Sequence, residues 1–176
     1  VLCHDMGKPK TTIVENKRIR SPGHARKGVE IARSFLHRLT NHKNLIAEVL
    51  PLVKDHMTPL EFHQNKAGDS AIRRLAGRVK RIDRLVKVAT ADKGGRPPLP
   101  WKFPLPEGEW LLARAEELAV KDSTPKAILM GKHLLEIGHH PGPQLGEILK
   151  AAYEAQLDGG FNDVEGGLEW IRAQDS

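Results

Sequence analysis

A histidine–aspartate pair near the start of the sequence is the strongest local signal for chemistry. His4 and Asp5 stand side by side and are followed by Gly7 and Pro9, a combination typical of a helix end. An imidazole and a carboxylate placed there can reach the same ion, and this donor pair suits Mn, Ni, Zn or Fe, with Mg acceptable where phosphate dominates. The pair alone has a plain alternative, because His-Asp also occurs at ordinary helix ends.

Three further residues support a metal site. His24 follows a Pro-Gly pair at a predicted helix start, and His56 comes at the end of another predicted helix. Asp92 lies among small apolar residues, where a carboxylate is costly unless it is paired or bound to a metal. The candidate metal ligands are His4, Asp5, His24, His56 and Asp92, with His4 and Asp5 as the catalytic pair. We expect the other histidines at the surface or in loops, namely His37, His42, His63, His133, His139 and His140.

Two other residues compete for a chemical role and are given simpler interpretations. Asp83 is the alternative to Asp92 as a carboxylate ligand. It stands between Arg81 and Arg84, where a solvated ion pair explains it better. Cys3, the single cysteine, is expected to be a buried thiol beside the His-Asp pair. One cysteine excludes a disulfide framework and a Cys-rich zinc site, so a reducing, cytoplasmic setting is expected.

The elements that must position these residues are predicted to be helices. Apolar residues at helical spacing mark residues 21–36, 45–53, 70–79, 82–91, 110–118, 127–136, 144–153 and 164–171. We expect Asn41 or Asn44 to cap the second of these, and Pro51 to kink or split it. The third is expected to be capped by Asp69 or Ser70. Strand signals are scarce and only 5% of residues are aromatic, so the predicted fold is all-α, a helical bundle followed by a small helical tail.

A proline-rich segment at 97–106 is the predicted linker between a domain at 1–96 and a tail at 107–176. The net charge of +6 is uneven, because residues 1–100 carry 21 Lys/Arg against 9 Asp/Glu, whereas residues 101–176 carry 7 against 13. A basic half indicates RNA or nucleotide phosphates as a partner, although a solvated basic face explains it too. The predicted RNA-binding residues are Arg73, Arg74, Arg78, Lys80, Arg81, Arg84, Lys87, Lys93 and Arg96. No apolar run is long enough to span a membrane, and a membrane is not expected as a partner.

The order of these motifs resembles the HD-domain superfamily of metal-dependent phosphohydrolases, whose pattern is H…HD…D. More narrowly, the chain is similar to the C-terminal part of bacterial CCA-adding tRNA nucleotidyltransferases and the related poly(A) polymerase family. The segments that carry the resemblance are residues 4–12, 23–30, 54–57, 91–96, 131–138, 141–146 and 154–159. The resemblance covers nearly the whole chain. Its tail segments are the more specific part, since the HD pattern recurs in many phosphohydrolases.

The resemblance implies a binuclear centre for Mg, Mn or Ni, with His4, Asp5 and Asp92 as ligands and His24 and His56 as further ligands. Residues 141–143 and their flanking helices would belong to a tail that grips the elbow and acceptor stem of tRNA. The chain opens on Val1, and the family's first histidine and its nucleotidyltransferase head both lie upstream of this point. We therefore expect a fragment that does not add nucleotides by itself.

Two functions stay open at this point. In the first, the basic half is a metal-dependent phosphohydrolase whose substrates include 2′,3′-cyclic phosphates and 2′-nucleotides. In the second, the HD motif is a relic and the chain is a non-catalytic scaffold that binds tRNA. A stand-alone nucleotidase acting on free nucleotides is disfavoured, because such an enzyme has no use for an RNA-gripping tail. The metal, the oligomeric state and the choice between CCA and A addition by the parent protein stay open.

Overall fold

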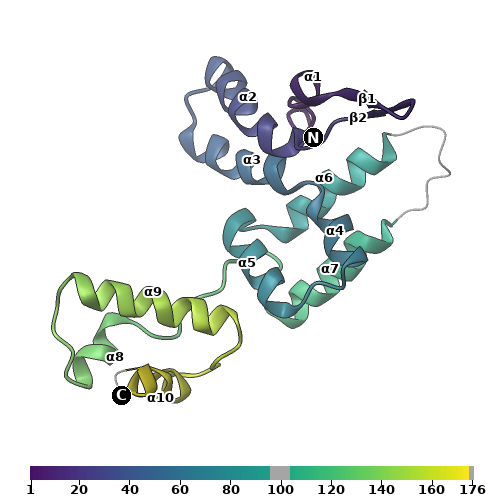
Figure 1. Cartoon of the computed structure of the whole chain (residues 1–176). Coiled ribbons are helices and arrows are strands. Elements are labelled where there is room, and N and C mark those ends of the chain that lie inside the picture. Colours follow the sequence, from purple (N-terminus) through teal and green to yellow (C-terminus); the bar gives the residue numbers. More distant parts are fainter. Residues whose placement is uncertain (96–103, 175–176) are drawn as a thin grey trace.

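A computed structural model describes residues 1–95 and 104–174, so Arg96 and most of the predicted linker lie outside the described residues. The described residues form helices and one small hairpin (Figure 1), and the all-α prediction is confirmed. The helices are α1 (Lys8–Thr11), α2 (His24–Leu39), α3 (Lys43–Asp55), α4 (Thr58–Gln64), α5 (Asp69–Val79), α6 (Ile82–Gly94), α7 (Pro106–Glu117), α8 (Gly131–Glu136), α9 (Pro143–Leu157) and α10 (Val164–Gln174). Within the described ranges, none of these helices combines the length and apolar character needed to cross a bilayer.

The hairpin lies between α1 and α2. Strands β1 (Ile13–Glu15) and β2 (Arg18–Arg20) pair antiparallel. They are joined by Asn16 and Lys17, whose φ angles are 49° and 60°. Positive φ at both central residues is the mark of a type I′ turn, whose twist matches that of the flanking strands. This hairpin was not predicted from the sequence, because each strand has only three residues and carries too short a pattern to be recognised.

The first core cluster joins α2 and α3 to the start of the chain. Gly28, Ala32 and Leu36 recur every four residues and form the buried stripe of α2. The stripe packs against the buried side of α3, and Cys3 is buried in the same cluster, as expected. This packing fixes the start of the chain, and with it the His-Asp pair, against the first turn of α2.

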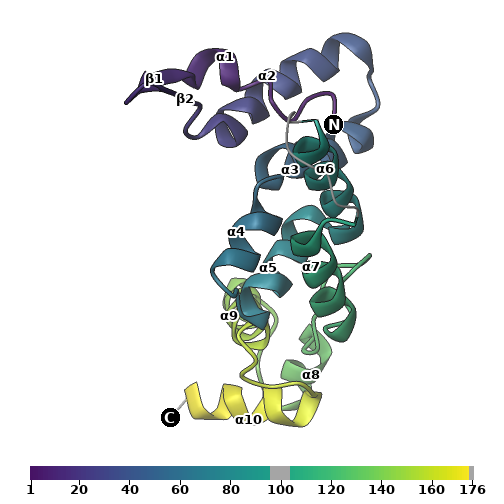
Figure 2. The same ribbon diagram turned by 90° about the vertical axis from the view of Figure 1, so that its right-hand side faces the viewer.

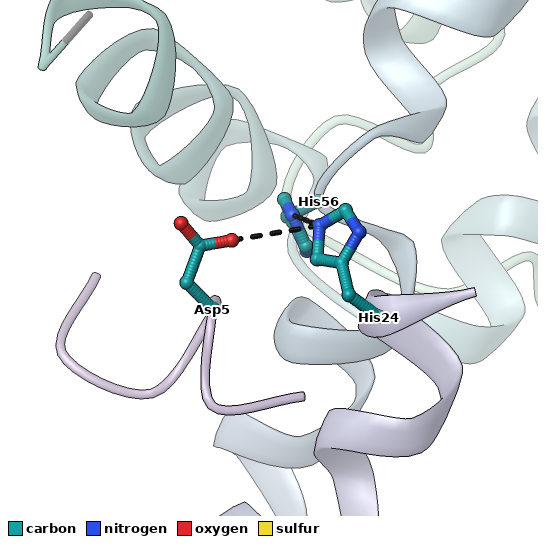
Figure 3. Close-up of side chains that lie close together, drawn as sticks. All are labelled: Asp5, His24 and His56. Atoms are coloured by element: carbon teal, nitrogen blue, oxygen red, sulfur yellow. Dashed lines mark hydrogen bonds and ion pairs between the residues drawn. The ribbon is translucent and has the colours of Figure 1, made fainter. Parts of the chain in front are cut away.

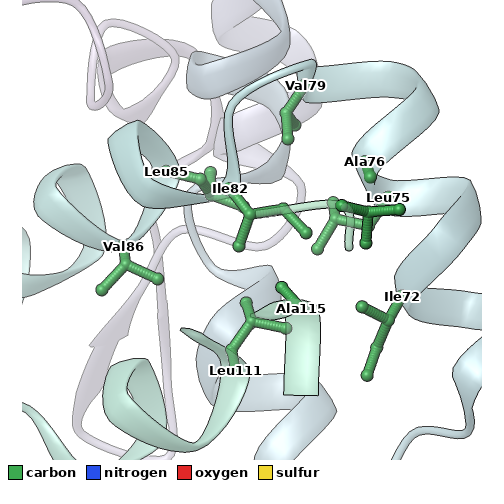
Figure 4. Packing of buried hydrophobic residues seen from close by; sticks show 10 residues of the cluster. Ile72, Leu75, Ala76, Val79, Ile82, Leu85, Val86, Leu111 and Ala115 are labelled. Carbon is green, nitrogen blue, oxygen red and sulfur yellow. The ribbon is translucent and has the colours of Figure 1, made fainter. Parts of the chain in front are cut away.

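The second core cluster joins α5, α6 and α7 (Figure 4). Its members include Ile72, Leu75, Ile82, Leu85 and Leu111, all with no exposed surface. Helix α7, which follows the predicted linker, thus shares a core with the two helices that precede it. The helical bundle therefore includes α7 and extends in sequence to Val120, which is buried in the same cluster.

A third, separate cluster forms the tail. It is built from residues of α8, α9 and α10 and their connecting segments, and its buried members are Leu129, Leu134, Ala152, Phe161 and Ile171. Figures 1 and 2 show the tail at the opposite end of the molecule from α1 and the hairpin. The tail meets the bundle where α9 lies beside α5.

The local details of several helices differ from the predictions. His42 caps α3 in place of either asparagine, because its Nδ1 accepts the backbone N–H of Leu45 at 3.2 Å. Pro51 does not split α3, which runs through it as one helix from Lys43 to Asp55. Gly68 is the residue before α5, since Asp69 and Ser70 instead direct their side chains to tertiary partners.

The predicted helix over 127–136 begins only at Gly131. The residues expected in its first turn, 127–130, form no regular secondary structure and instead bond to α9. The amide of Ile128 donates to Gln156 Oε1 at 2.9 Å, and Gln156 Nε2 donates to the carbonyl of Lys126 at 2.8 Å. These bonds tie the segment before α8 to the tail cluster and satisfy backbone groups that a helix would have used.

Candidate metal centre

The structure brings together all five predicted metal ligands from four different elements. His4 and Asp5 lie in the turns before α1, and His24 is the first residue of α2. His56 follows the last residue of α3, and Asp92 lies in the last two turns of α6. These positions are 88 residues apart at most in the chain, so only tertiary packing makes them neighbours.

A close approach of two backbones sets the position of the His-Asp pair. A Cβ atom on Gly7 would lie 2.0 Å from the carbonyl oxygen of His24 and 2.7 Å from the amide nitrogen of Gly28. No side chain fits in such a contact, so glycine is required two residues after Asp5. The contact brings the turn that holds Asp5 directly against the first turn of α2, which begins with His24.

The first donor group contains Asp5, His24 and His56 (Figure 3). Asp5 Oδ1 is 3.5 Å from His24 Nε2, and His24 Nε2 is 3.2 Å from His56 Nε2. Two ligands of one ion that each bind at about 2.1 Å lie about 3.0–3.4 Å apart, so these separations suit a shared ion. His56 has no exposed surface, whereas Asp5 and His24 are partly exposed, so the group is closed on one side and open on the other.

The second donor group contains His4, Asp5 and Asp92. His4 Nε2 lies 3.2 Å from Asp92 Oδ1 and 3.3 Å from Asp5 Oδ2. Asp5 therefore belongs to both groups and presents one oxygen to each. The His4 and His56 rings meet edge to face with centroids 5.2 Å apart, which places the two groups next to each other.

The three histidines share one hydrogen-bonding pattern, in which Nδ1 lies at the backbone carbonyl oxygen three residues earlier. The pairs are His4 with Val1 at 2.5 Å, His24 with Ser21 at 2.8 Å and His56 with Val53 at 2.7 Å. A carbonyl oxygen only accepts hydrogen bonds, so Nδ1 carries the hydrogen and the lone pair of Nε2 faces the shared space. This is the arrangement by which a backbone carbonyl orients a metal-binding imidazole.

The electrostatics of the site favour a carboxylate and a neutral imidazole. Burial opposes ionisation of Asp5, but the hydrogen bond from Lys8 and the nearby His4 and His24 outweigh it and lower its pKa. Burial lowers the pKa of His56, and His24 and His4 lower it further against the opposing effects of the Val53 carbonyl and Asp92. Both shifts favour the protonation states in which these side chains bind metal.

Two features of the donor set fit a cation. The Nε2 atoms of His24 and His56 face each other at 3.2 Å, and two lone pairs at that distance repel unless a proton or a metal ion lies between them. The lowered pKa of His56 disfavours the proton on that ring. In addition, Asp5 Oδ1 is buried with no hydrogen-bond partner among the described residues. A buried carboxylate oxygen without a partner is costly, and a metal ion would satisfy it.

The sequence reasoning missed the role of Lys8. Its Nζ donates to Asp5 Oδ2 at 2.5 Å and holds the carboxylate in place. The three-residue spacing of Asp5 and Lys8, typical of ion pairs on a helix, was the available signal. The expected ion pair of Asp83 is confirmed, because Arg81 donates to both of its oxygens at 2.8 and 2.7 Å.

Most of the predicted RNA-binding cations make contacts within the protein. The carboxylate partners are Glu154 and Asp158 for Arg74, Asp55 for Arg78, Asp83 for Arg81, Glu48 for Arg84 and Glu107 for Lys93. Arg73 donates to the carbonyl of Leu157 at 3.3 Å. Lys80 and Lys87 are exposed and have no ion pair within residues 1–95 and 104–174. Arg96 lies outside the described residues.

Comparison with known proteins gives consistent matches. The HD domain model matches residues 1–87. A CC-adding tRNA nucleotidyltransferase from Thermus thermophilus is 34% identical over 163 residues, which is 90% of this chain and 35% of that protein. An A-adding tRNA nucleotidyltransferase from Deinococcus radiodurans is 32% identical over 165 residues, 90% of this chain and 37% of that protein. This chain spans about a third of the length of these curated relatives. No solved structure gives a significant match.

These matches agree with the geometry. HD domains are helical, bind divalent metals and typically belong to metal-dependent hydrolases. The structure is helical over the matched range and holds two groups of histidine and aspartate that could each bind a metal ion. The residues that carry the chemistry, the fold and the family match point the same way, and residues 1–87 of this chain therefore belong to the HD domain family.

Proposed function

We propose that this chain is the HD-domain and tail region of a tRNA nucleotidyltransferase, and that its HD domain is a divalent-metal phosphohydrolase acting on the phosphoester ends of RNA. The observation that carries the proposal is the pair of donor groups joined by Asp5. His24 and His56 would hold one ion with Asp5, and His4 and Asp92 would hold a second with the other oxygen of Asp5.

Two divalent ions held by these residues would supply an activated water and a clamp on the phosphoryl oxygens. The residues of this chain contribute the fixed donors and a half-open space in front of them. Asp5 and His24 are partly exposed, so a phosphoester at the end of a polymer can approach them, whereas His56 closes the back of the site. Substrates of the 2′,3′-cyclic phosphate and 2′-nucleotide type fit this arrangement because they present a phosphoryl group at a chain end.

The partner in this proposal is tRNA. It is supported by relatives that are described as tRNA nucleotidyltransferases and that match 90% of this chain. The tail would hold the elbow and acceptor stem, with the residues around Pro141–Pro143 at the contact, and the exposed Lys80 and Lys87 would meet the RNA backbone. We place the boundary between the bundle and the tail after Val120, because α7 packs in the bundle core and α8, α9 and α10 form a separate cluster.

The test is hydrolysis of 2′,3′-cyclic AMP by the chain with Mn or Ni, with and without chelator, alongside the Asp5→Ala variant. We expect turnover that chelator removes and that Asp5→Ala abolishes. Turnover that Asp5→Ala leaves unchanged would refute the mechanism.

One observation favours the second candidate function, a tRNA-binding scaffold with a vestigial HD site. Lys8 already neutralises Asp5 at 2.5 Å, so the carboxylate has a cation without any metal. In that case the chain would bind tRNA strongly and in a salt-sensitive way, and it would hydrolyse no phosphoester with any divalent metal.

A further inference from the structure

The hairpin formed by β1 and β2 has no packing partner in the described part of the chain. All six strand residues are exposed, and the two strands make substantial contacts only with each other. Figures 1 and 2 show the hairpin extending outward from α1 and α2. A lone two-stranded hairpin is only marginally stable in water, so an exposed one of this kind is expected to serve a binding role.

The charge of this region is strongly positive. Residues 8–27 carry seven Lys or Arg and one Glu, which leaves a net charge of +6, equal to that of the whole chain. Five of these cations make no ion pair within residues 1–95 and 104–174, and they are Lys10, Lys17, Arg18, Arg26 and Lys27. Most arginines on α5 and α6, by contrast, already pair with carboxylates of the protein. Unpaired cations are the ones available to release counterions from a polyanion.

The two faces of the hairpin differ. Register pairs Val14 with Ile19, so these two side chains share one face and are 75% and 77% exposed. The pairs next to them place Arg18 and Arg20 together on the opposite face. Ile13 and Glu15 lie on that face as well, and Glu15 is 3.7 Å from Arg20 in an exposed pair, so the face has a net charge of +1. Two arginines on one strand face are suited to contact phosphate groups.

The position of the hairpin ties it to the metal centre. Its first strand begins eight residues after Asp5, beyond α1, and its second strand ends four residues before His24. The Oδ1 atom of Asp5 and the Nε2 atom of His24 are 3.5 Å apart. The base is held by a 2.8 Å hydrogen bond between Thr12 Oγ1 and Ser21 Oγ. Each strand of three residues extends about 10 Å. The hairpin is therefore joined to the two segments that carry Asp5 and His24, next to the metal centre in the chain.

We propose that the basic face of this hairpin binds the RNA backbone next to the 3′ end and directs that end to the metal centre. The inference rests on the proposed function, because it assumes that the site acts on RNA ends. The hairpin contact is to phosphate and sugar, so it carries no sequence preference. The α5–α6 cations then serve mainly to hold the protein together, with Lys80 and Lys87 as secondary contacts.

The test compares two double variants of the full chain that each remove two exposed cations without ion pairs. Lys17→Gln/Arg18→Gln changes the hairpin, and Lys43→Gln/Lys66→Gln is the control with the same net charge, at two cations for which no RNA contact is proposed. Binding of a tRNA transcript is measured by fluorescence anisotropy in chelator over a range of salt. Two lost phosphate contacts should weaken binding about tenfold and reduce the salt slope by about 1.5, and the control should lose less than about twofold. Equal losses in both variants would overturn the inference.

Kinetics distinguish failure of the inference from failure of the proposed function. The hairpin variant should raise the KM for an oligonucleotide with a 2′,3′-cyclic end and leave the turnover of 2′,3′-cyclic AMP unchanged, because the mononucleotide does not reach the hairpin. If the wild-type chain hydrolyses neither substrate, the proposed activity fails, and binding still decides the hairpin contact. If the hairpin variant binds the tRNA transcript as tightly as the wild type, the hairpin does not contact the RNA backbone and the inference is wrong.

Discussion

Replacing Asp5 by Asn should remove tight binding of divalent metal and leave the fold intact. Asp5 is the one side chain common to both donor groups, with Oδ1 3.5 Å from His24 Nε2 and Oδ2 3.3 Å from His4 Nε2. Asparagine has the same shape but no negative charge, and its amide nitrogen cannot bind a metal. Mutation of a residue that only hydrogen-bonds to a metal ligand already lowers the affinity for the metal by about 10–100-fold. Loss of a shared charged ligand should therefore cost more than about 100-fold, or roughly 2.7 kcal/mol.

The assay is thermal unfolding of the bundle with and without Mn. At a metal concentration of about 100 times its Kd, the wild-type chain gains about 2.7 kcal/mol. For a chain of this size that corresponds to a rise in Tm of about 5–10 °C. At the same concentration Asp5→Asn should gain less than about 0.5 kcal/mol and shift by about 1 °C. Titration calorimetry should report the matching loss of affinity directly.

The matched control is Asp83→Asn on α6, which removes the same charge from a carboxylate that Arg81 holds outside the donor groups. This variant should retain the full Mn-dependent rise in Tm even if its own Tm falls. An Asp5→Asn chain with the same Mn-dependent rise as the wild type, and the same calorimetric affinity, would show that these residues are not the metal centre.

Two further predictions test the packing and the attachment of the tail. Gly7→Ala should destabilise the chain by about 2–3 kcal/mol, because the new Cβ would meet the His24 carbonyl, whereas Gly77→Ala on α5, with nothing within 4 Å, should stabilise it by about 0.5–1 kcal/mol. Urea unfolding measures both, and equal effects would contradict the close approach. Arg74 and Ser70 lower the pKa of Asp158 to about 2, so its ion pair with Arg74 is fully present above the unfolded pKa of about 3.9 and is lost only as the pH falls toward 2. A carboxyl titration followed by NMR should give a midpoint for Asp158 near 2, and a midpoint near 3.9 would be inconsistent with this ion pair.

Helix content was predictable because apolar residues recur at helical spacing almost throughout the chain. The stripe of Gly28, Ala32 and Leu36 on α2 shows this most simply. Helix ends were less predictable, since they depend on side chains with more than one available partner. Ser70 was a plausible cap, but in the fold its hydroxyl donates to Asp158 on α9 at 2.6 Å. A tertiary partner of this kind leaves no local trace in the sequence.

The candidate metal ligands could be predicted from residue type together with position in the sequence. A histidine beside an aspartate, a histidine at a helix start and an aspartate among apolar residues are costly or uncommon placements, and metal binding accounts for each of them. The same logic failed for Lys8, because a lysine near a turn is common and its bond to Asp5 depends on the local backbone. The basic residues of α5 and α6 could be counted from the sequence, but their carboxylate partners on α3, α7 and α9 could not.

What the sequence determined by itself is thus the set of donors, the helical class and the excess of positive charge in the first half, since these depend on residue type and local spacing. Only the tertiary structure decided how the donors divide into two groups around Asp5, and which cations are neutralised within the protein and which remain available on the hairpin. The reason is physical. A metal centre and an ion pair both depend on distances of a few ångströms between residues far apart in the chain, and those distances exist only after the helices have packed.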